Sequence, residues 1–516
     1  METKVDYLVI GAGPSGLQIG YYLEKAKRDY CILEAGETAG TFFTKYPRHR
    51  TLISINKVYT GYKNAEVNLR FDWNSLLSDD YSPLFKQYDQ QYFPAADNIV
   101  NYFNDFAEQY HLNVKYGVKI VKISKPDEFQ LEDQQGNLYI AKRLIIATGF
   151  TKPYLPPIPG IELTENYVDV SVNPDDFKNQ RVLIIGKGNS GFETANNLVE
   201  TAAVIHILSP HSLNLAWKTH YVGHLRAVNN NFLDTYHLKS QNSVIDATIK
   251  NIKRKGNQFV VSIRYSHAKG EETDLTYDRV ITCTGFRFDD TIFDDACKPA
   301  LAINNRMPKQ TYEWESTNIK DLYFAGTLMQ MRDYKHTTSG FIHGFRYNCR
   351  ILQRILDKKY HGVSLPCQQI TANPEQVLDS CLQRINQSSA LWQQFGFIGD
   401  LIVIDEGQAR YYEELPLDYI HNTELGQNEH YYTVTLEFGQ FTEEDPFHIE
   451  RDTDPSWASK SPYLHPVIRR FCGSKLVAEQ HLLEDINGEW KAEKHIAVLR
   501  EFFQSQLLKH EMLVAV

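Results

Sequence analysis

Residues 5–34 read VDYLVIGAGPSGLQIGYYLEKAKRDYCILE, and this stretch decides the fold. The apolar run at residues 5–10 predicts a buried strand, and the periodic apolar positions after the glycine turn predict a helix. A second apolar run at residues 30–33 predicts another strand, which ends on Glu34. A strand, a glycine-rich turn, a helix and an acid in this order are typical of a fold that binds a dinucleotide.

Each glycine of the turn has a physical role in such a site. Gly11 permits the tight turn, Gly13 lets a pyrophosphate approach the backbone, and Gly16 lets the helix pack closely on the strand. The helix N-terminus offers unpaired N–H groups and a positive dipole to phosphates. Glu34 is placed to accept hydrogen bonds from ribose hydroxyls. We therefore expect the adenosine diphosphate part of a cofactor here.

The same pattern returns in residues 181–191, RVLIIGKGNSG, followed by a predicted helix and a predicted strand at residues 204–208. Apolar runs at residues 144–149, 279–285 and 322–326 end in small residues, where a backbone comes close to another group. Two nested dinucleotide folds favour a flavin in the first and a nicotinamide coenzyme in the second.

The other segments give weaker signals. Residues 51–95 predict a long irregular excursion, and loops of that length inside a compact domain are usually functional. Strands are expected at residues 113–123, 127–132 and 137–140, a helix capped by Asn98, a helix at 340–358, a helix from Asn373 to Arg384, a strand at 401–404, a half-buried strand at 431–438 and a helical stretch at 475–510.

Composition places the chain among ordinary globular proteins. It has 516 residues, with 42% apolar and 23% charged, which predicts two or three domains. A net charge of −10 gives no reason to expect nucleic acid or an anionic membrane as a partner. Seven dispersed cysteines without a C-x-x-C predict neither a metal site nor a redox disulfide, and they fit a reducing compartment. Without a signal peptide or a long apolar run, we expect a cytoplasmic protein.

With both glycine turns in view, the chain resembles the class B flavin-dependent monooxygenases, which bind FAD in the first fold and a nicotinamide coenzyme in the second. The chain lacks the C-terminal retention tetrapeptide of one relative, an endoplasmic-reticulum flavoprotein associated with degradation, so we expect a soluble cousin. The segments that resemble this FAD-dependent oxidoreductase family lie at residues 42–50, 52–57, 72–77, 340–347 and 461–467.

The resemblance implies an α/β fold with two nested Rossmann-like dinucleotide-binding domains of the flavin monooxygenase type and a small C-terminal α+β extension. We expect an FAD-binding domain at residues 1–152 and 322–362. An NAD(P)H-binding domain is expected at residues 153–321. The extension, at residues 363–516, has no predicted role.

The implied function is that of an FAD-dependent, NADPH-consuming monooxygenase. In that family NADPH reduces FAD, O2 gives a flavin C4a-(hydro)peroxide, and oxygen passes to a nitrogen, sulfur or carbon centre of a small molecule. Two alternatives remain open. One is an NADPH-dependent flavin oxidase or reductase that passes electrons to another acceptor, and the other is a flavin-stabilised scaffold that binds a protein partner. A homodimer is also left open.

Site residues follow from the motifs and from the resemblance. Asn56 matches the family position beside the flavin C4a edge and is the expected catalytic residue, with an asparagine that satisfies loop backbone as the alternative. The expected FAD-binding residues are Gly11, Gly13, Pro14, Ser15, Gly16, Glu34, Ala35, Gly40, Thr41, Phe42, Ile120, Ala147, Thr148, Gly149, Gly326 and Thr327. The expected coenzyme-binding residues are Gly186, Gly188, Asn189, Ser190, Ser209 and His211.

Coenzyme choice depends on the residues after the strand at 204–208. An arginine is common there in the family, and Ser209 and His211 stand in its place, with Lys218 or Arg226 as further phosphate partners. No acid follows this strand, which favours NADPH over NADH.

Several other residues have two interpretations. Arg48 and Arg50 meet either an acidic substrate or the coenzyme phosphates, or they are solvated surface charges. Cys283 is expected to pack as a small apolar residue. His343 and Arg346 lie three apart on one face of the expected helix, whose start points at the flavin in the family, and a buried structural histidine is the other interpretation of His343. The loop after Gly326 is expected to border the flavin through Asp333, Tyr334 and His336.

Overall fold

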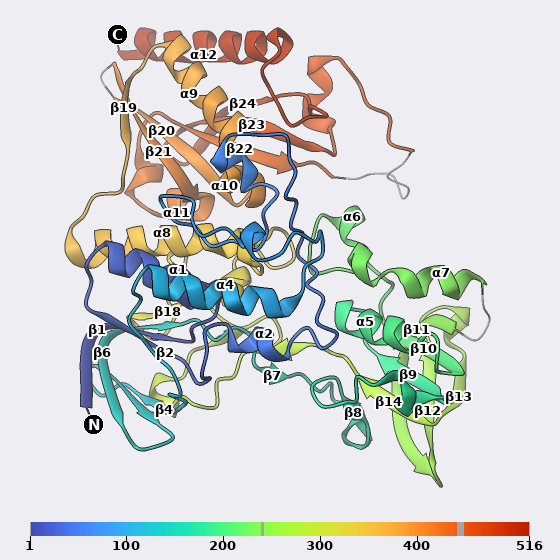
Figure 1. Ribbon diagram of the computed structural model, residues 1–516. Coiled ribbons are helices and arrows are strands. Elements are labelled where there is room, and N and C mark those ends of the chain that lie inside the picture. Colours follow the sequence, from blue (N-terminus) through green and yellow to red (C-terminus); the bar gives the residue numbers. More distant parts are fainter. Residues whose placement is uncertain (1, 239–241, 406, 441–447, 515–516) are drawn as a thin grey trace.

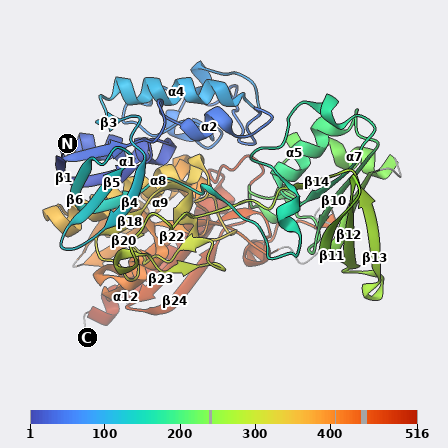
Figure 2. The same ribbon diagram turned by 90° about the horizontal axis from the view of Figure 1, so that it is seen from below.

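The computed structural model describes residues 2–238, 242–405, 407–440 and 448–514. Three sheets organise the chain, one in each of three successive parts of the molecule (Figure 1). Figure 2 shows the first two sheets side by side, joined by segments of chain that run between them, with the third unit packed on the first.

The first sheet is built on β1 (Glu2–Ile10), whose last four residues are fully or almost fully buried. Val9 pairs in register with Ile32 on one side and with Ile145 on the other, both in parallel. The remaining strands are β2 (Tyr30–Leu33), β3 (Val114–Lys115), β4 (Ile120–Ser124), β5 (Phe129–Asp133), β6 (Leu138–Ile146) and β18 (Leu322–Phe324), in the order β3-β2-β1-β6-β5-β4 with β18 beside β6.

Three helices cover one face of this sheet. α1 (Pro14–Lys25) and α8 (Ile342–His361) pack against each other, and α4 (Ala96–Gln109) lies beside α1 (Figure 1). α8 is buried along most of its length because the C-terminal unit covers its other side. The excursion at residues 51–95 contains only α3 (Ala65–Asn68) and a short 3-10 turn, as expected.

The second sheet repeats the arrangement later in the chain. β9 (Arg181–Ile185) pairs in parallel with β10 (Val204–Ser209) and with β14 (Arg279–Thr282), and α5 (Asn189–Leu198) follows β9. The outer strands are β8 (Glu165–Asn166), β11 (Asn242–Lys255), β12 (Gln258–Tyr265) and β13 (Glu272–Tyr277). β7 (Lys152–Pro153) pairs with β15 (Phe286–Arg287) where the chain crosses between the two folds.

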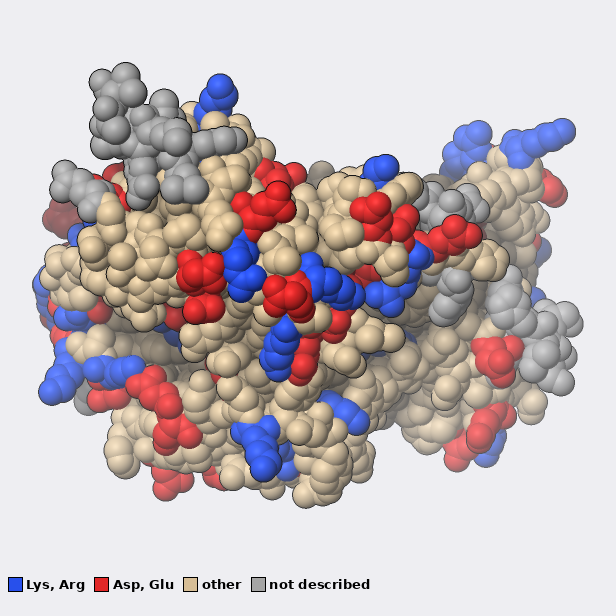
Figure 3. All heavy atoms as spheres, turned by 90° about the horizontal axis from the view of Figure 1, so that it is seen from above, with Lys and Arg blue, Asp and Glu red and all other residues tan. Residues whose placement is uncertain are grey.

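The C-terminal unit is an antiparallel sheet with helices. Its strands are β19 (Gln368–Thr371), β20 (Ile398–Asp405), β21 (Gln408–Pro416), β22 (Tyr431–Phe438), β23 (Leu464–Cys472) and β24 (Lys475–His481), in the order β19-β21-β20-β22-β23-β24. Its helices are α9 (Pro374–Gln387), α10 (Ser389–Gln393), α11 (Leu417–Asn422) and α12 (Glu493–Val514). On the face that carries α12, acidic and basic side chains are interspersed (Figure 3).

Several predicted boundaries are wrong. The helix expected at Asn98 begins at Ala96, and the Asn98 amide donates to Asp89 at 2.9 Å instead of capping. The strand expected at 113–123 is split between β3 and β4, which pair with different neighbours. The strands expected at 137–140 and 144–149 are one strand, β6, because Lys142 pairs with Asp6 and so does not interrupt it.

Two C-terminal predictions are also wrong. β22 is not half-buried: it lies between β20 and β23 with both faces covered, so the threonines of its alternating pattern are buried as well. The stretch at 475–510 is helical only in α12, and its first part is β24. β24 is an edge strand whose mostly exposed side chains do not alternate between buried and exposed positions, so the sequence does not indicate a strand there. The domain limits at residues 152, 321 and 362 stay a prediction.

Within the described ranges, no helix has the length and apolar character needed to cross a membrane.

Candidate functional site

The first glycine turn is tight at two positions and open at the third. Gly11 has φ +102°, and a Cβ there would lie 2.9 Å from the carbonyl oxygen of Ala147. A Cβ on Gly16 would lie 1.8 Å from the carbonyl oxygen of Gly11. A Cβ on Gly13 would meet no protein atom within 4 Å, so space remains in front of the N-terminus of α1. This is the geometry that a pyrophosphate requires.

The second turn repeats this geometry. Gly186 has φ +119°, and a Cβ there would lie 2.3 Å from the carbonyl oxygen of Cys283. A Cβ on Gly191 would lie 2.3 Å from the carbonyl oxygen of Gly186, whereas one on Gly188 would meet nothing within 4 Å. Cys283 is buried in the core, as expected of a small apolar residue. The residues present therefore fit a phosphate group in both turns.

Glu34 is fixed by the loops around it. Its two carboxylate oxygens accept hydrogen bonds from the backbone N–H of Ala12 at 2.7 Å and of Gly36 at 2.9 Å. Each oxygen keeps a further lone pair that a ribose hydroxyl can use. Ala35, beside it, is exposed.

Segments from several elements converge on the first turn. The Gly40 N–H donates to the carbonyl oxygen of Ala12 at 2.9 Å, which places Thr41 and the half-exposed Phe42 next to the turn. A Cβ on Gly326 would lie 2.3 Å from Oγ of Ser15, so the chain after β18 passes close to the start of α1. Thr327 is the next residue and therefore lies near the first turn as well. The first turn thus also gathers Pro14, Ala147, Thr148 and Gly149. The side chain of Ile120 lies in the core at the start of β4, and contact of its backbone with the adenine stays a prediction.

Asn56 is buried and partly engaged. Its side-chain amide donates to the carbonyl oxygen of Asp89 at 2.7 Å, and its backbone N–H donates to the carbonyl oxygen of Tyr92 at 2.9 Å. Its carboxamide oxygen accepts no hydrogen bond from the described residues. That oxygen and the second amide hydrogen are the groups with which Asn56 can contact a ligand.

Arg48 and Arg50 lie differently from both interpretations of their sequence. The Arg48 guanidinium donates to the carbonyl oxygens of Tyr167, Val168 and Val170, at 2.8 Å for Val170. These hydrogen bonds connect a loop of the first fold to the second fold. Arg50 donates to backbone oxygens of its own loop and pairs with Asp97 at 2.6 Å.

A buried acid that belongs to no sequence motif lies next to the second turn. Glu193 on α5 accepts a hydrogen bond from the Tyr167 hydroxyl, which in turn accepts one from the Arg48 N–H at 3.2 Å. Burial raises the pKa of Glu193 to about 7. Tyr167 and Ser190 line a small pocket with residues 282–286, at the carboxyl ends of β9 and β14.

The residues predicted to bind the coenzyme fall into two groups. Ser209 ends β10, and its hydroxyl donates to the carbonyl oxygen of His211, which is exposed. The side chain of Asn189 forms its hydrogen bonds with the protein itself. Its amide donates to the carbonyl oxygen of His224 at 2.9 Å, and its oxygen accepts from the backbone N–H of Arg226 at 3.0 Å.

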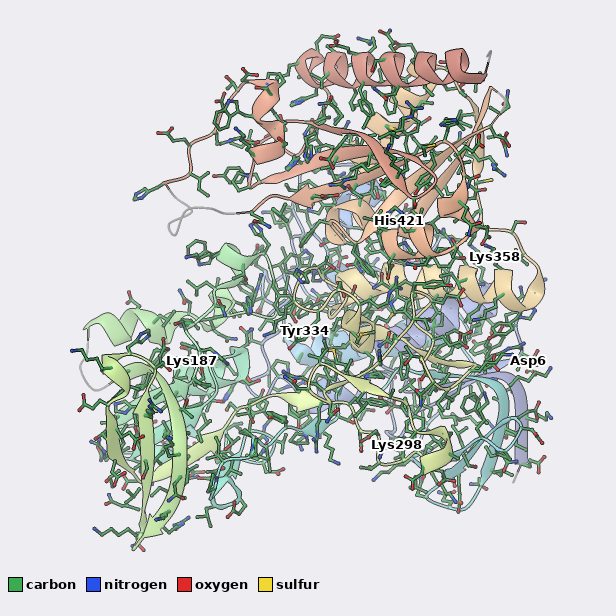
Figure 4. The ribbon with its side chains drawn as sticks, turned by 180° about the vertical axis from the view of Figure 1, so that it is seen from behind. Asp6, Lys187, Lys298, Tyr334, Lys358 and His421 are labelled. Carbon is green, nitrogen blue, oxygen red and sulfur yellow. The ribbon has the colours of Figure 1, made fainter. Side chains whose placement is uncertain are left out.

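The structure corrects the inference that no acid lies near the end of this strand. Asp246 on β11 pairs in register with Ser209. Its carboxylate accepts hydrogen bonds from the buried Lys187 ammonium and from the Ser212 hydroxyl (Figure 4 labels Lys187). Burial opposes the shift, but these donors hold the pKa of Asp246 below its usual value. The acid was missed because only strand pairing brings it there, and Lys187 compensates its charge.

At the start of α8 the two predicted residues are fully buried. Arg346 donates to the carbonyl oxygens of Ser75 and Leu69, both at 2.8 Å, and so holds the excursion. The His343 ring stacks on Trp73 with centroids 4.2 Å apart, and neither ring nitrogen has a hydrogen-bond partner among the described residues. Burial, with Arg346 and Arg226, holds the pKa of His343 well below its usual value.

The loop before α8 is built into the C-terminal unit. Asp333 is buried, which raises its pKa to about 6, while His336 is exposed and Tyr334 lies between the units (Figure 4). Gln394 of the C-terminal unit accepts a hydrogen bond from Thr337 at 2.8 Å and donates to Asn348 at 2.9 Å. Gln394 lies in no motif, so no sequence signal indicates this contact.

Comparison with known proteins agrees with this arrangement. Residues 8–326 match the model of the pyridine nucleotide-disulphide oxidoreductase family. The chain is 36% identical to mouse FAD-dependent oxidoreductase domain-containing protein 2 over 561 aligned residues, which is 97% of this chain and 84% of the relative.

Two solved structures share the fold of 69% of the chain. Bacillithiol disulfide reductase from Staphylococcus aureus has a TM-score of 0.51 at 17% identity, with 99% of its chain covered. A flavin-containing monooxygenase from Stenotrophomonas maltophilia has a TM-score of 0.50 at 18% identity, with 99% covered. The chain therefore belongs to the pyridine nucleotide-disulphide oxidoreductase family and is an FAD-dependent oxidoreductase.

Proposed function

We propose that the protein is an FAD- and NADPH-dependent monooxygenase that oxygenates a nitrogen, sulfur or carbon centre of a small molecule with O2. The observation that carries the proposal is that the two glycine turns, here called the first and second cradle, have the same shape. In each cradle two glycines leave no room for a Cβ, Gly11 and Gly16 in the first and Gly186 and Gly191 in the second, while the space in front of the helix is open. One cradle serves FAD and the other serves the coenzyme.

The chain's own residues bind and orient in this proposal. The N–H groups at the start of α1 hold the FAD pyrophosphate across the space in front of Gly13, and Glu34 accepts from the ribose. The coenzyme pyrophosphate lies likewise in front of Gly188 at the start of α5. When bound, FAD takes up electrons from the coenzyme and passes them to O2.

NADPH is the proposed coenzyme because Lys187 offsets the charge of Asp246 beside the ribose position. The exposed imidazoles of His211 and of His267, whose Nε2 lies 3.1 Å from Asp246, add no negative charge to this edge. A 2′-phosphate meets no uncompensated acid there among the described residues.

Exclusion of water is the second requirement of a monooxygenase. Asn56, His343 and Arg346 are each at most 2% exposed, and the excursion that carries Asn56 is held down by Arg346. Asn56 is proposed as the catalytic residue, whose amide hydrogen-bonds at the reacting edge of the flavin without titrating.

The experiment is a coupling assay. FAD-loaded protein is mixed with NADPH and O2 in the presence of a panel of small amines, sulfides and ketones, and NADPH consumed, oxygenated product and hydrogen peroxide are all quantified. We expect at least one substrate to convert most of the NADPH oxidised into oxygenated product. Stoichiometric hydrogen peroxide with every substrate would contradict a monooxygenase and identify an oxidase.

A further inference from the structure

The side chain of Arg226 has an unusual environment. Its guanidinium lies over the indole of Trp73, with the central carbon 5.0 Å from the ring centroid. Nε is buried without a hydrogen-bond partner, and among the described residues this side chain has no ion pair with a carboxylate. Burial lowers the pKa of Arg226, and the nearby Tyr92 hydroxyl opposes the shift.

Another arginine stacks on an indole and has a carboxylate partner as well. The Arg332 guanidinium lies 4.2 Å from the centroid of the Trp314 ring, and it also pairs with the carboxylate of Asp418, at 3.1 Å from Nε. Arg226 has the aromatic face but lacks the carboxylate. A guanidinium fork is the side chain best suited to a carboxylate, and leaving its donors unpaired is costly.

Arg226 is also held rigidly at the junction of the two folds. Its backbone N–H donates to Asn189 at the start of the second cradle's helix. On the other side, the Trp73 backbone N–H donates to the carbonyl oxygen of Ile55, next to Asn56. Trp73 also stacks on the fully buried His343, whose ring nitrogens both lack a hydrogen-bond partner in the described part of the chain. A cation without a counterion and an unpaired imidazole therefore lie beside the segment that carries the proposed catalytic residue.

We propose that Arg226 and Trp73 form a subsite for the carboxylate of the substrate. The guanidinium binds the carboxylate, and the indole keeps the guanidinium in place. The inference rests on the proposed function, because it assumes a small molecule near the flavin. The coenzyme phosphate is another anion that a guanidinium binds, and a binding experiment separates it from a substrate carboxylate.

The test uses benzoate and its neutral analogue benzamide as probes of the FAD-loaded protein, read from the change in flavin absorbance. We expect saturable binding of benzoate and at least about tenfold weaker binding of benzamide, since the neutral amide cannot form the bidentate ion pair that a carboxylate forms with a guanidinium. Arg226→Gln is expected to weaken benzoate at least about tenfold, and Arg226→Lys by less. Arg254→Gln is the matched control, because the exposed Arg254 stacks on Phe259 at 4.2 Å far from both cradles, and it leaves benzoate binding unchanged.

Two results would overturn the proposal. One is equal affinity of the wild-type protein for benzoate and benzamide, which needs no variant and so does not depend on folding of Arg226→Gln. The other is an Arg226→Gln protein that binds benzoate normally but NADPH more weakly, which would assign the cation to the coenzyme. Reduction of the wild-type flavin by NADPH, measured first, tests the proposed function separately.

Discussion

Gly13→Ala adds one methyl group to the first cradle, and we expect it to weaken FAD binding without destabilising the protein. Gly13 has φ −73°, which alanine adopts without strain, and the new Cβ meets no protein atom within 4 Å. The free protein should therefore be as stable as the wild type or more stable by up to about 1 kcal/mol, because alanine has less conformational entropy when unfolded. The methyl group occupies the space proposed for the pyrophosphate instead.

The size of the FAD effect follows from the hydrogen bonds that the methyl group prevents. Displacing the pyrophosphate from the α1 N-terminus removes one or two charge-assisted hydrogen bonds of about 1.5–3 kcal/mol each, so the dissociation constant should rise about tenfold to a hundredfold or more. The assay is an FAD titration of apoprotein by flavin fluorescence, beside urea unfolding of the same apoprotein.

Two matched substitutions control for position. Gly16→Ala brings its Cβ to 1.8 Å from the Gly11 carbonyl oxygen and should destabilise folding by about 3 kcal/mol or more. Gly188→Ala, in the second cradle, should weaken the coenzyme and not FAD. If Gly13→Ala bound FAD as tightly as the wild type, the placement of the pyrophosphate would be refuted.

Three further predictions follow from the buried polar groups. Burial raises the pKa of Glu193 in the folded protein to about 7, above its value in the unfolded chain. The free energy of unfolding of the wild type should therefore fall by about 3 kcal/mol as pH rises from 4.5 to 7. Glu193→Gln should remove this pH dependence in urea unfolding, and a pH dependence retained in the variant would refute the assignment. Gln394→Ala should lower the free energy of unfolding by about 2–3 kcal/mol, because it removes hydrogen-bond partners from the loop before α8 and from Asn348. As a control, Gln387→Ala at an exposed position should change the free energy of unfolding by less than about 0.5 kcal/mol. Equal effects of the two substitutions would contradict the loop's dependence on Gln394. Asn189→Ala should free the 223–229 loop and raise the KM for NADPH several-fold with FAD content retained, and an unchanged KM would contradict that placement.

The parts of the fold that local sequence determines could be predicted from it. The strand–turn–helix units at residues 5–34 and 181–198 are specified by close-range apolar periodicity and by glycines whose need is steric, and both units are found where expected. The correct interpretation of Cys283 as a small packed residue has the same origin.

The rest depends on contacts between distant segments. Asp246 reaches the coenzyme edge only through pairing of β10 with β11, and Gln394 reaches the loop before α8 only through docking of the C-terminal unit. The polar residues within β6 and the threonines of β22 do not show from sequence that these strands are continuous or buried. Their burial is determined by the strands and helices that pack against them. Neither interpretation of Arg48 is correct, because a sequence cannot show that three backbone carbonyls lie within reach of its guanidinium.

If one cradle holds FAD and the other holds NADPH, electrons should pass between the two bound cofactors. The most direct measurement is an anaerobic titration of the purified, FAD-loaded protein with NADPH, followed by flavin absorbance. We predict that a stoichiometric amount of NADPH bleaches the bound flavin, and that Gly188→Ala requires a higher NADPH concentration for the same effect. A protein that takes up no FAD, or whose bound flavin stays oxidised under excess NADPH, would contradict this arrangement.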